Sequence, residues 1–131
     1  MEYYFNVHLE NVSVDKAVSL VEEKLKDVGF GILSTIDMRT TLRDKLNVEF
    51  YPYLILQACN PSYAYEALKT EDKIGTLLPC NIIVQEKKPG SIEIAAVNPL
   101  ASMQAVNNLK LNDIALEVSE RLRWMINHLQ S

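Results

Sequence analysis

The sequence predicts an α+β fold in which a single antiparallel sheet carries two long helices on one face. Residues 3–9 alternate between apolar and polar side chains, as a half-buried strand does. Two apolar stripes with helical spacing run through residues 13–28 and 113–129. Lys87-Lys88-Pro89-Gly90 separates two apolar runs and is typical of a hairpin turn, which joins antiparallel neighbours.

The elements are expected in the order β-α-β-β-β-β-α, within one domain covering residues 1–131. After the first strand, Ser13 is a favourable N-cap for the first long helix, and Gly29 ends that helix as a left-handed cap. A second strand is predicted over residues 30–38. Residues 39–48 are charged and predict a short helix or loop, with Thr40 or Thr41 as its cap.

The second half of the chain predicts a central strand, a short helix, a hairpin and a final helix. Residues 51–58 are apolar on both faces, which is typical of a strand covered on both sides. Asn60 is expected to cap a helix that begins at Pro61 and reaches Thr70. Residues 82–86 and 91–97 predict the hairpin, and residues 100–112 predict a loop. Asp113 is then expected to open the last helix.

Charge and hydropathy exclude several classes of protein. The 131 residues carry a net charge of −4, and the pI is near 5.2, which argues against a general nucleic-acid binder. No apolar run approaches the roughly 20 residues that cross a membrane, and residues 1–4 show no secretory signal. The two cysteines are therefore expected to be free thiols in the cytoplasm.

Those two cysteines lie in near-mirror settings. Cys59-Asn60 closes the apolar strand of residues 51–58, whereas Cys80-Asn81 opens the next apolar run. Only one helix-sized segment separates the two pairs. If the two strands are antiparallel neighbours, both thiols and both amides gather at one end of the sheet. We therefore predict a site at this end.

The candidate site has a functional and a structural interpretation. Cys59 is the best candidate for a catalytic residue, because backbone N–H groups at the following helix could stabilise a thiolate. Asn60 and Asn81 could orient a polar ligand, and Asp37 adds a charge at a strand end. Alternatively, both cysteines are small apolar side chains in a core, and both amides bond to local backbone.

The sequence predicts no metal and no cofactor. A structural zinc site needs four ligands, and neither a Cys-x-x-Cys motif nor closely spaced histidines supply them. His8 and His128 are far from both cysteines in the sequence. The four glycines form no phosphate-binding loop.

Several motifs resemble one family of small bacterial and archaeal proteins, which is called domain of unknown function 302. The motifs are residues 41–46, Ala58-Cys59-Asn60-Pro61, the small residues Ala64 and Ala67, residues 75–84, and Asn98-Pro99. The resemblance extends over nearly the whole chain. It implies a TATA-binding-protein-like fold of β-α-β₄-α form, usually as a dimer. It implies no activity, and likeness to a DNA-binding architecture does not carry DNA binding with it.

Three functions remain open at this point. The first is a ligand-binding or regulatory protein with a polar or thiol site built from Cys59, Asn60, Cys80 and Asn81. The second is a thiol-dependent enzyme or redox-active protein that uses Cys59. The third is a structural or partner-binding protein with inert cysteines. Because residues 51–58 are apolar on both faces, we also expect a homodimer or a ligand groove over the second face of the sheet.

Overall fold

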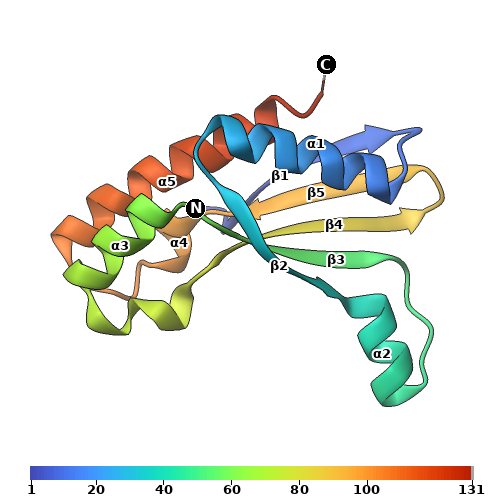
Figure 1. Cartoon of the computed structure of the whole chain (residues 1–131), viewed down its shortest axis with the longest axis horizontal. Helices are drawn as coiled ribbons and strands as arrows, with labels where there is room; N and C mark the ends of the chain where they lie inside the picture. Colours follow the sequence, from blue (N-terminus) through green and yellow to red (C-terminus); the bar gives the residue numbers. More distant parts are fainter. Residues whose placement is uncertain (131) are drawn as a thin grey trace.

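The computed structural model describes residues 1–130 and contains a five-stranded antiparallel sheet (Figure 1). The strands are β1 (Tyr4–Glu10), β2 (Gly31–Asp37), β3 (Tyr53–Cys59), β4 (Cys80–Lys88) and β5 (Ser91–Val97). Their order across the sheet is β1-β5-β4-β3-β2, and every neighbouring pair is antiparallel. The predicted fold class and the predicted order of strands and long helices are both confirmed.

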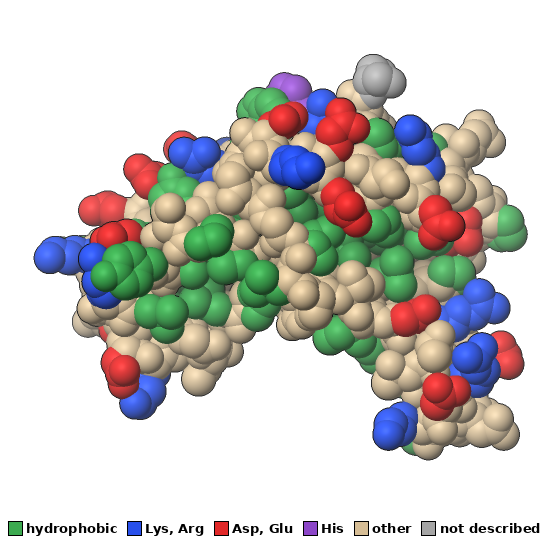
Figure 2. Space-filling view, viewed as in Figure 1, with side chains coloured by type: hydrophobic (Ala, Val, Ile, Leu, Met, Phe, Trp, Pro, Cys, Tyr) green, Lys and Arg blue, Asp and Glu red, His purple; other side chains and the backbone are tan. Residues whose placement is uncertain are grey.

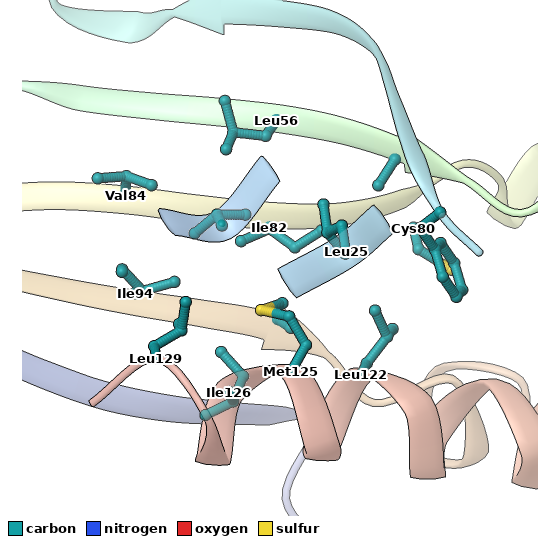
Figure 3. Packing of buried hydrophobic residues seen from close by; sticks show 14 of the residues in the cluster. Leu25, Leu56, Cys80, Ile82, Val84, Ile94, Leu122, Met125, Ile126 and Leu129 are labelled. Carbon is teal, nitrogen blue, oxygen red and sulfur yellow. The ribbon is translucent and has the colours of Figure 1, made fainter. Parts of the chain in front are cut away.

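Two long helices, α1 (Val14–Asp27) and α5 (Leu109–Asn127), cover one face of the sheet (Figure 1). Alternate residues of each strand point toward them, so that Leu56 of β3, Ile82 of β4 and Ile94 of β5 have no exposed surface. Figure 3 shows these side chains meeting Leu25 of α1 and Met125 of α5. This layer is the main hydrophobic core, and it fixes which residues of each strand face away from the helices.

The other face of the sheet, which we call the open face, consists of polar and apolar rows that run across the strands. His8, Glu93, Gln85 and Tyr53 are successive register partners on four strands. Gln85 Nε2 donates a hydrogen bond of 3.0 Å to Glu93 Oε1, and His8 Nε2 lies 3.8 Å from Glu93 Oε2.

The adjacent row, which we call the apolar row, is made of Ala95, Ile83, Ile55 and Ile36. Ala95 is buried, Ile55 and Ile83 are half-buried, and Ile36 is exposed. The prediction that residues 51–58 present apolar side chains on both faces is therefore correct.

The shorter helices lie at the two ends of the strands. At one end are α3 (Pro61–Thr70), the 3-10 helix η1 (Asp72–Leu77) and α4 (Pro99–Ser102); at the other is α2 (Met38–Leu46). Figure 1 shows α2 extending from the sheet on the side away from α1 and α5. In the space-filling view the molecule is an arch, with a hollow between α2 and the α3–η1 segment (Figure 2).

Several boundaries differ from the sequence-based predictions, and three of the differences arise at helix caps. The last helix begins at Leu109 rather than at Asp113, because Asn108 accepts hydrogen bonds from the N–H groups of Lys110 and Leu111. The helix α2 is capped by Asp37, not by Thr40 or Thr41, and residues 99–102 form a helical turn within the predicted loop. In each case a residue earlier in the chain satisfies the free N–H groups.

Over residues 1–130, no helix combines the length and the apolar character that crossing a membrane requires.

Candidate functional site

The two cysteines lie at the same end of the sheet, as the sequence predicted. Cys59 is the last residue of β3 and Cys80 is the first of β4, and Cys80 pairs in register with Ala58. Cys59 is half-buried, Cys80 is buried, and both are free thiols. The antiparallel pairing of β3 with β4 produces this proximity, because the end of one strand adjoins the start of the other.

A cavity of about 300 Å³ opens beside the two thiols, and we call it the cysteine cavity. Its walls come from the start of β2, the end of β3, the start of β4, α3, η1, α4 and the residue that follows it, and the first half of α5. The lining residues are Phe30, Leu33, Ala58, Cys59, Asn60, Tyr63, Ala64, Ala67, Leu68, Gly75, Leu78, Pro79, Cys80, Pro99, Met103, Leu111, Ile114, Ala115 and Val118.

The lining is almost entirely apolar. It contains no charged side chain, and the polar groups are the two thiols, the Asn60 amide and the Tyr63 hydroxyl. That hydroxyl accepts a hydrogen bond of 2.8 Å from Arg121 Nε, whose guanidinium lies over the Tyr63 ring. Tyr63 thus separates the cavity from a charged groove that Arg121 lines with Asp27, Glu117 and Glu120.

Asn60 has a structural task at the rim of the cavity. Its Oδ1 accepts a hydrogen bond from the Tyr63 N–H at the start of α3, and its Nδ2 donates to the Val28 carbonyl at the end of α1, both at 3.4 Å. The amide also lies against Gly29, where a Cβ atom would approach Asn60 Nδ2 to 2.8 Å. This geometry favours the structural interpretation of Asn60, although its side chain also lines the cavity.

The surroundings of both thiols favour the neutral form. Burial raises the pKa of the Cys59 thiol. Burial also raises the pKa of Cys80 to about 11, with a further contribution from the negative charge that Cys59 would carry. The position of Cys59 before α3 thus does not produce a lowered pKa. A thiolate nucleophile is scarce at neutral pH under these conditions.

Two residues predicted for the site lie elsewhere. Asn81 follows Cys80 by one position, so strand alternation places it on the open face, where it pairs with Gln57 and is exposed. There it lines a separate hollow of about 110 Å³. Asp37 pairs with Leu54, at the opposite end of β3 from Cys59. Including Asp37 in the site was wrong, because β2 runs antiparallel to β3 and carries its last residue away from the cysteines.

The wall supplied by Met103, Leu111, Ala115 and Val118 was missed in the sequence. Leu111 and Ala115 continue the apolar stripe of α5 toward its N-terminus at helical spacing, and that signal was available. The position of Met103 depends on the turn of α4, which begins at the Asn98-Pro99 motif.

Within residues 1–130 there is no group of three or more His, Cys, Asp or Glu side chains arranged to hold a metal ion.

Comparisons with other proteins identify the family and confirm the fold. A crystal structure of an uncharacterized conserved DUF302 protein from Bacillus stearothermophilus superimposes with a TM-score of 0.90 and 26% sequence identity, over 99% of this chain and 100% of that one. An uncharacterized protein from Aquifex aeolicus (strain VF5) is 39% identical over 44 residues, which are 34% of this chain and 31% of that protein. The model of the family described as "Domain of unknown function DUF302" matches residues 5–129. The chain therefore belongs to the DUF302 family.

Proposed function

We propose that this protein binds a small, largely apolar ligand in the cysteine cavity and does so as a homodimer. The observation that carries the proposal is the cavity itself. Its volume of about 300 Å³ falls at the lower end of the range of ligand pockets, roughly 300–1,000 Å³. Like those pockets, it combines an apolar lining with a few convergent polar groups.

The lining indicates the chemistry of the ligand. A charged group would lose its hydration in the cavity without gaining a partner there, since no lining side chain is charged. The ligand is therefore neutral where it enters, with an apolar body between α3 and α5. One polar atom of the ligand can face Asn60 or Tyr63. The sequence suggested a polar ligand, whereas the lining favours an apolar one.

The raised thiol pKa values argue against the alternative of a thiol-dependent enzyme. A catalytic cysteine requires a thiolate or an adjacent base. Burial raises the pKa of both Cys59 and Cys80 and so disfavours the thiolate, and neither histidine lines the cavity. In the proposed function the two thiols act as small, polarizable walls of the pocket.

The open face of the sheet supports the homodimer. Its apolar row includes Ile55 and Ile83, which remain half-buried in the single chain, and Ile36, which is exposed. Contiguous apolar surface of this kind is typical of a protein interface. The ligand cavity opens at the end of the sheet, so that the two parts of the proposal can be tested separately.

The ligand-binding proposal is tested by filling the cavity. Ala64 of α3 lines it, and Ala64→Leu places three additional carbon atoms inside. Ser62→Leu is the matched control, because Ser62 lies on the same helix, is exposed and does not line the cavity. The probe is 1-aminoanthracene, a neutral fluorescent aromatic molecule, titrated against the wild type and both variants.

We expect saturable binding by the wild type and by Ser62→Leu, and at least a tenfold weaker affinity for Ala64→Leu. Native mass spectrometry of the purified protein checks in parallel for a ligand retained from the cell. Equal affinities for Ala64→Leu and the wild type would place the probe elsewhere and contradict the proposal. An absence of saturable binding by the wild type would contradict it as well.

A further inference from the structure

The segment of residues 38–50, which we call the α2 arm, carries apolar side chains that few other parts of the chain cover. It comprises α2 and the chain that leads to β3. No residue of α2 is buried. Leu46 is 65% exposed, Val48 is 44% exposed and Phe50 is 36% exposed. Three exposed apolar side chains on one protruding segment favour a surface that a partner covers.

We propose that the partner is a second copy of this chain, and that each α2 arm packs into the hollow under the sheet of the other copy. The inference rests on the homodimer of the proposed function and specifies its contact. Because the same two surfaces meet twice, the contact is isologous and closes as a two-fold dimer without leaving an unpaired arm. Figure 2 shows an arch-shaped molecule, whose hollow leaves space for the α2 arm of a second copy.

The hollow offers the arm an apolar floor. The apolar row crosses the open face from Ala95 to Ile36. Beside it, Tyr53 precedes Ile55 by two residues on β3, and its ring centroid lies 6.2 Å from that of Tyr51. An arm that presents Leu46 and Val48 to this row removes apolar surface from water on both copies.

Charge favours the same occupant. The α2 arm contains Arg39, Arg43 and Lys45 against Asp44 and Glu49, a net charge of +1. The whole chain carries −4, so the rest of the molecule carries −5. A second copy therefore presents an acidic body to the basic arm and a basic arm to the acidic body, an arrangement that aids association and orientation.

The size of the sheet gives an independent reason for the arm to participate. Five strands of about seven residues, spaced roughly 4.8 Å apart with about 3.4 Å per residue, present a face of about 570 Å². A stable interface buries about 800 Å² on each partner. One side of a nine-residue helix, about 14 Å long and 10 Å wide, contributes most of the remaining area.

The affinity of the dimer tests the contact. We substitute the exposed Leu46 with Gln, which removes its apolar surface without adding a charge. Leu116→Gln is the control, because Leu116 is an exposed leucine at 45% on α5, on the helix-covered side of the sheet. Dissociation constants come from sedimentation equilibrium of the wild type and of each variant.

We expect Leu46→Gln to weaken the dimer at least tenfold, since each copy loses one buried leucine, and Leu116→Gln to stay within twofold of the wild type. If the wild type sediments at micromolar concentration as a monomer of 14.9 kDa, the homodimer itself is contradicted. A wild-type dimer whose affinity is unchanged by Leu46→Gln would overturn the arm contact and leave the homodimer standing.

The location of the contact is tested by cross-linking. In a background with Cys59 and Cys80 replaced by alanine, Leu46→Cys is combined with Ile83→Cys and oxidised. The species of twice 14.9 kDa is isolated, and its disulfide-linked peptides are identified by mass spectrometry. We expect Leu46 joined to Ile83, and no such link for Leu116→Cys with Ile83→Cys. Equal yields from both pairs would overturn the proposed position of the arm.

Discussion

The two ends of the sheet use the same device, a capped helix, with different consequences. At the cysteine end, Asn60, Asn98 and Asn108 cap α3, α4 and α5. At the other end Asp37 caps α2. Each asparagine accepts from its own helix through Oδ1 and donates through Nδ2 to a carbonyl elsewhere in the chain. Asp37 accepts from the Thr40 N–H, and its side chain makes no second connection within residues 1–130.

The difference follows from the chemistry of the two side chains. An amide has both a donor and an acceptor, whereas an ionised carboxylate only accepts. The asparagine caps therefore start a helix and also fasten it to the segment before β1, to the end of α1 or to α3. These ties hold the walls of the cysteine cavity, while the aspartate cap gives α2 no such tie, and the main contacts of α2 are with β2 and β3. A pocket whose walls are tied by side chains and a projecting arm result from similar local motifs.

Removing one cap from each end gives the largest expected effect. Asn98 is only 4% exposed; its Oδ1 accepts from Ser119 Oγ and the Leu100 N–H, and its Nδ2 donates to the Glu2 carbonyl. Asn98→Ala loses the cap and leaves buried polar groups without partners, at a cost of about 3 to 4 kcal/mol. Asp37→Ala is expected to cost about 0.5 to 1 kcal/mol, because water replaces the cap at this exposed site.

Urea denaturation of both variants checks this comparison. Asn98→Asp tests the tie to Glu2 more directly, because aspartate keeps the oxygen that caps α4 and lacks the N–H group that donates to the Glu2 carbonyl. We expect Asn98→Asp to remain well below the wild type in unfolding free energy. Equal losses for Asn98→Ala and Asp37→Ala would show that both caps act only on their own helices, and the contrast between the two ends would disappear.

The next effect concerns the buried thiol at the cysteine end. The pKa of Cys80 is about 11, against an ordinary value of 9.0. Between these values the unfolded chain has lost the thiol proton and the folded chain still holds it, so stability falls as pH rises. The loss approaches roughly 2 to 3 kcal/mol near pH 11, since each pKa unit corresponds to about 1.4 kcal/mol.

The measurement compares the wild type with Cys80→Ala, because tyrosines and lysines titrate in the same range in both proteins. Below pH 9 the difference in unfolding free energy between them is expected to be constant. Above pH 9 the difference in unfolding free energy should narrow. Only the wild type has the Cys80 thiol, whose ionisation stabilises the unfolded chain relative to the folded one. Parallel curves up to pH 11 would mean that Cys80 ionises normally and that the cavity is wetter than its lining indicates.

Much of the fold could be predicted from local sequence. Alternation in residues 3–9, the apolar stripes and the hairpin turn determined the sheet and both long helices, because the spacing of apolar residues directly reflects which face is buried. The gathering of Cys59 and Cys80 followed from the order of the strands. The cap of α3 at Asn60-Pro61 was also predicted, since a cap acts within three residues of its helix.

The remainder depends on contacts between residues far apart in the chain. Asp37 was grouped with the cysteines because it also lies at a strand end, and only the register shows that it is the other end. The caps at Asn98 and Asn108 were not predicted, and their ties to Glu2 and Thr70 join segments 96 and 38 positions apart. The apolar character of the cavity depends on Leu111 and Ala115 of α5 meeting α3, which no local pattern specifies.

The smallest expected effect comes from replacing one glycine with alanine at each end, which compares the cost of an unfavourable backbone conformation with the cost of a steric clash. Gly29, beside the cysteine cavity, has φ of +85°, and Gly90, in the hairpin turn at the other end, has φ of +80°. Both conformations are unfavourable for alanine by about 1 kcal/mol. At Gly90 the added Cβ meets no atom within 4 Å, whereas at Gly29 it would lie 2.8 Å from Asn60 Nδ2. Gly29→Ala therefore displaces the amide that joins α1 to α3.

We expect Gly90→Ala to lose about 1 kcal/mol in urea denaturation and Gly29→Ala about 1 kcal/mol more, the usual cost of a lost cap. The double variant Gly29→Ala/Asn60→Ala tests the cause. Once the amide is absent, alanine at position 29 should cost no more than it does at position 90, because only the backbone term remains. If Gly29→Ala still cost about 1 kcal/mol more than Gly90→Ala without the Asn60 amide, the extra loss would not come from displacing that amide, and the proposed cause would be wrong.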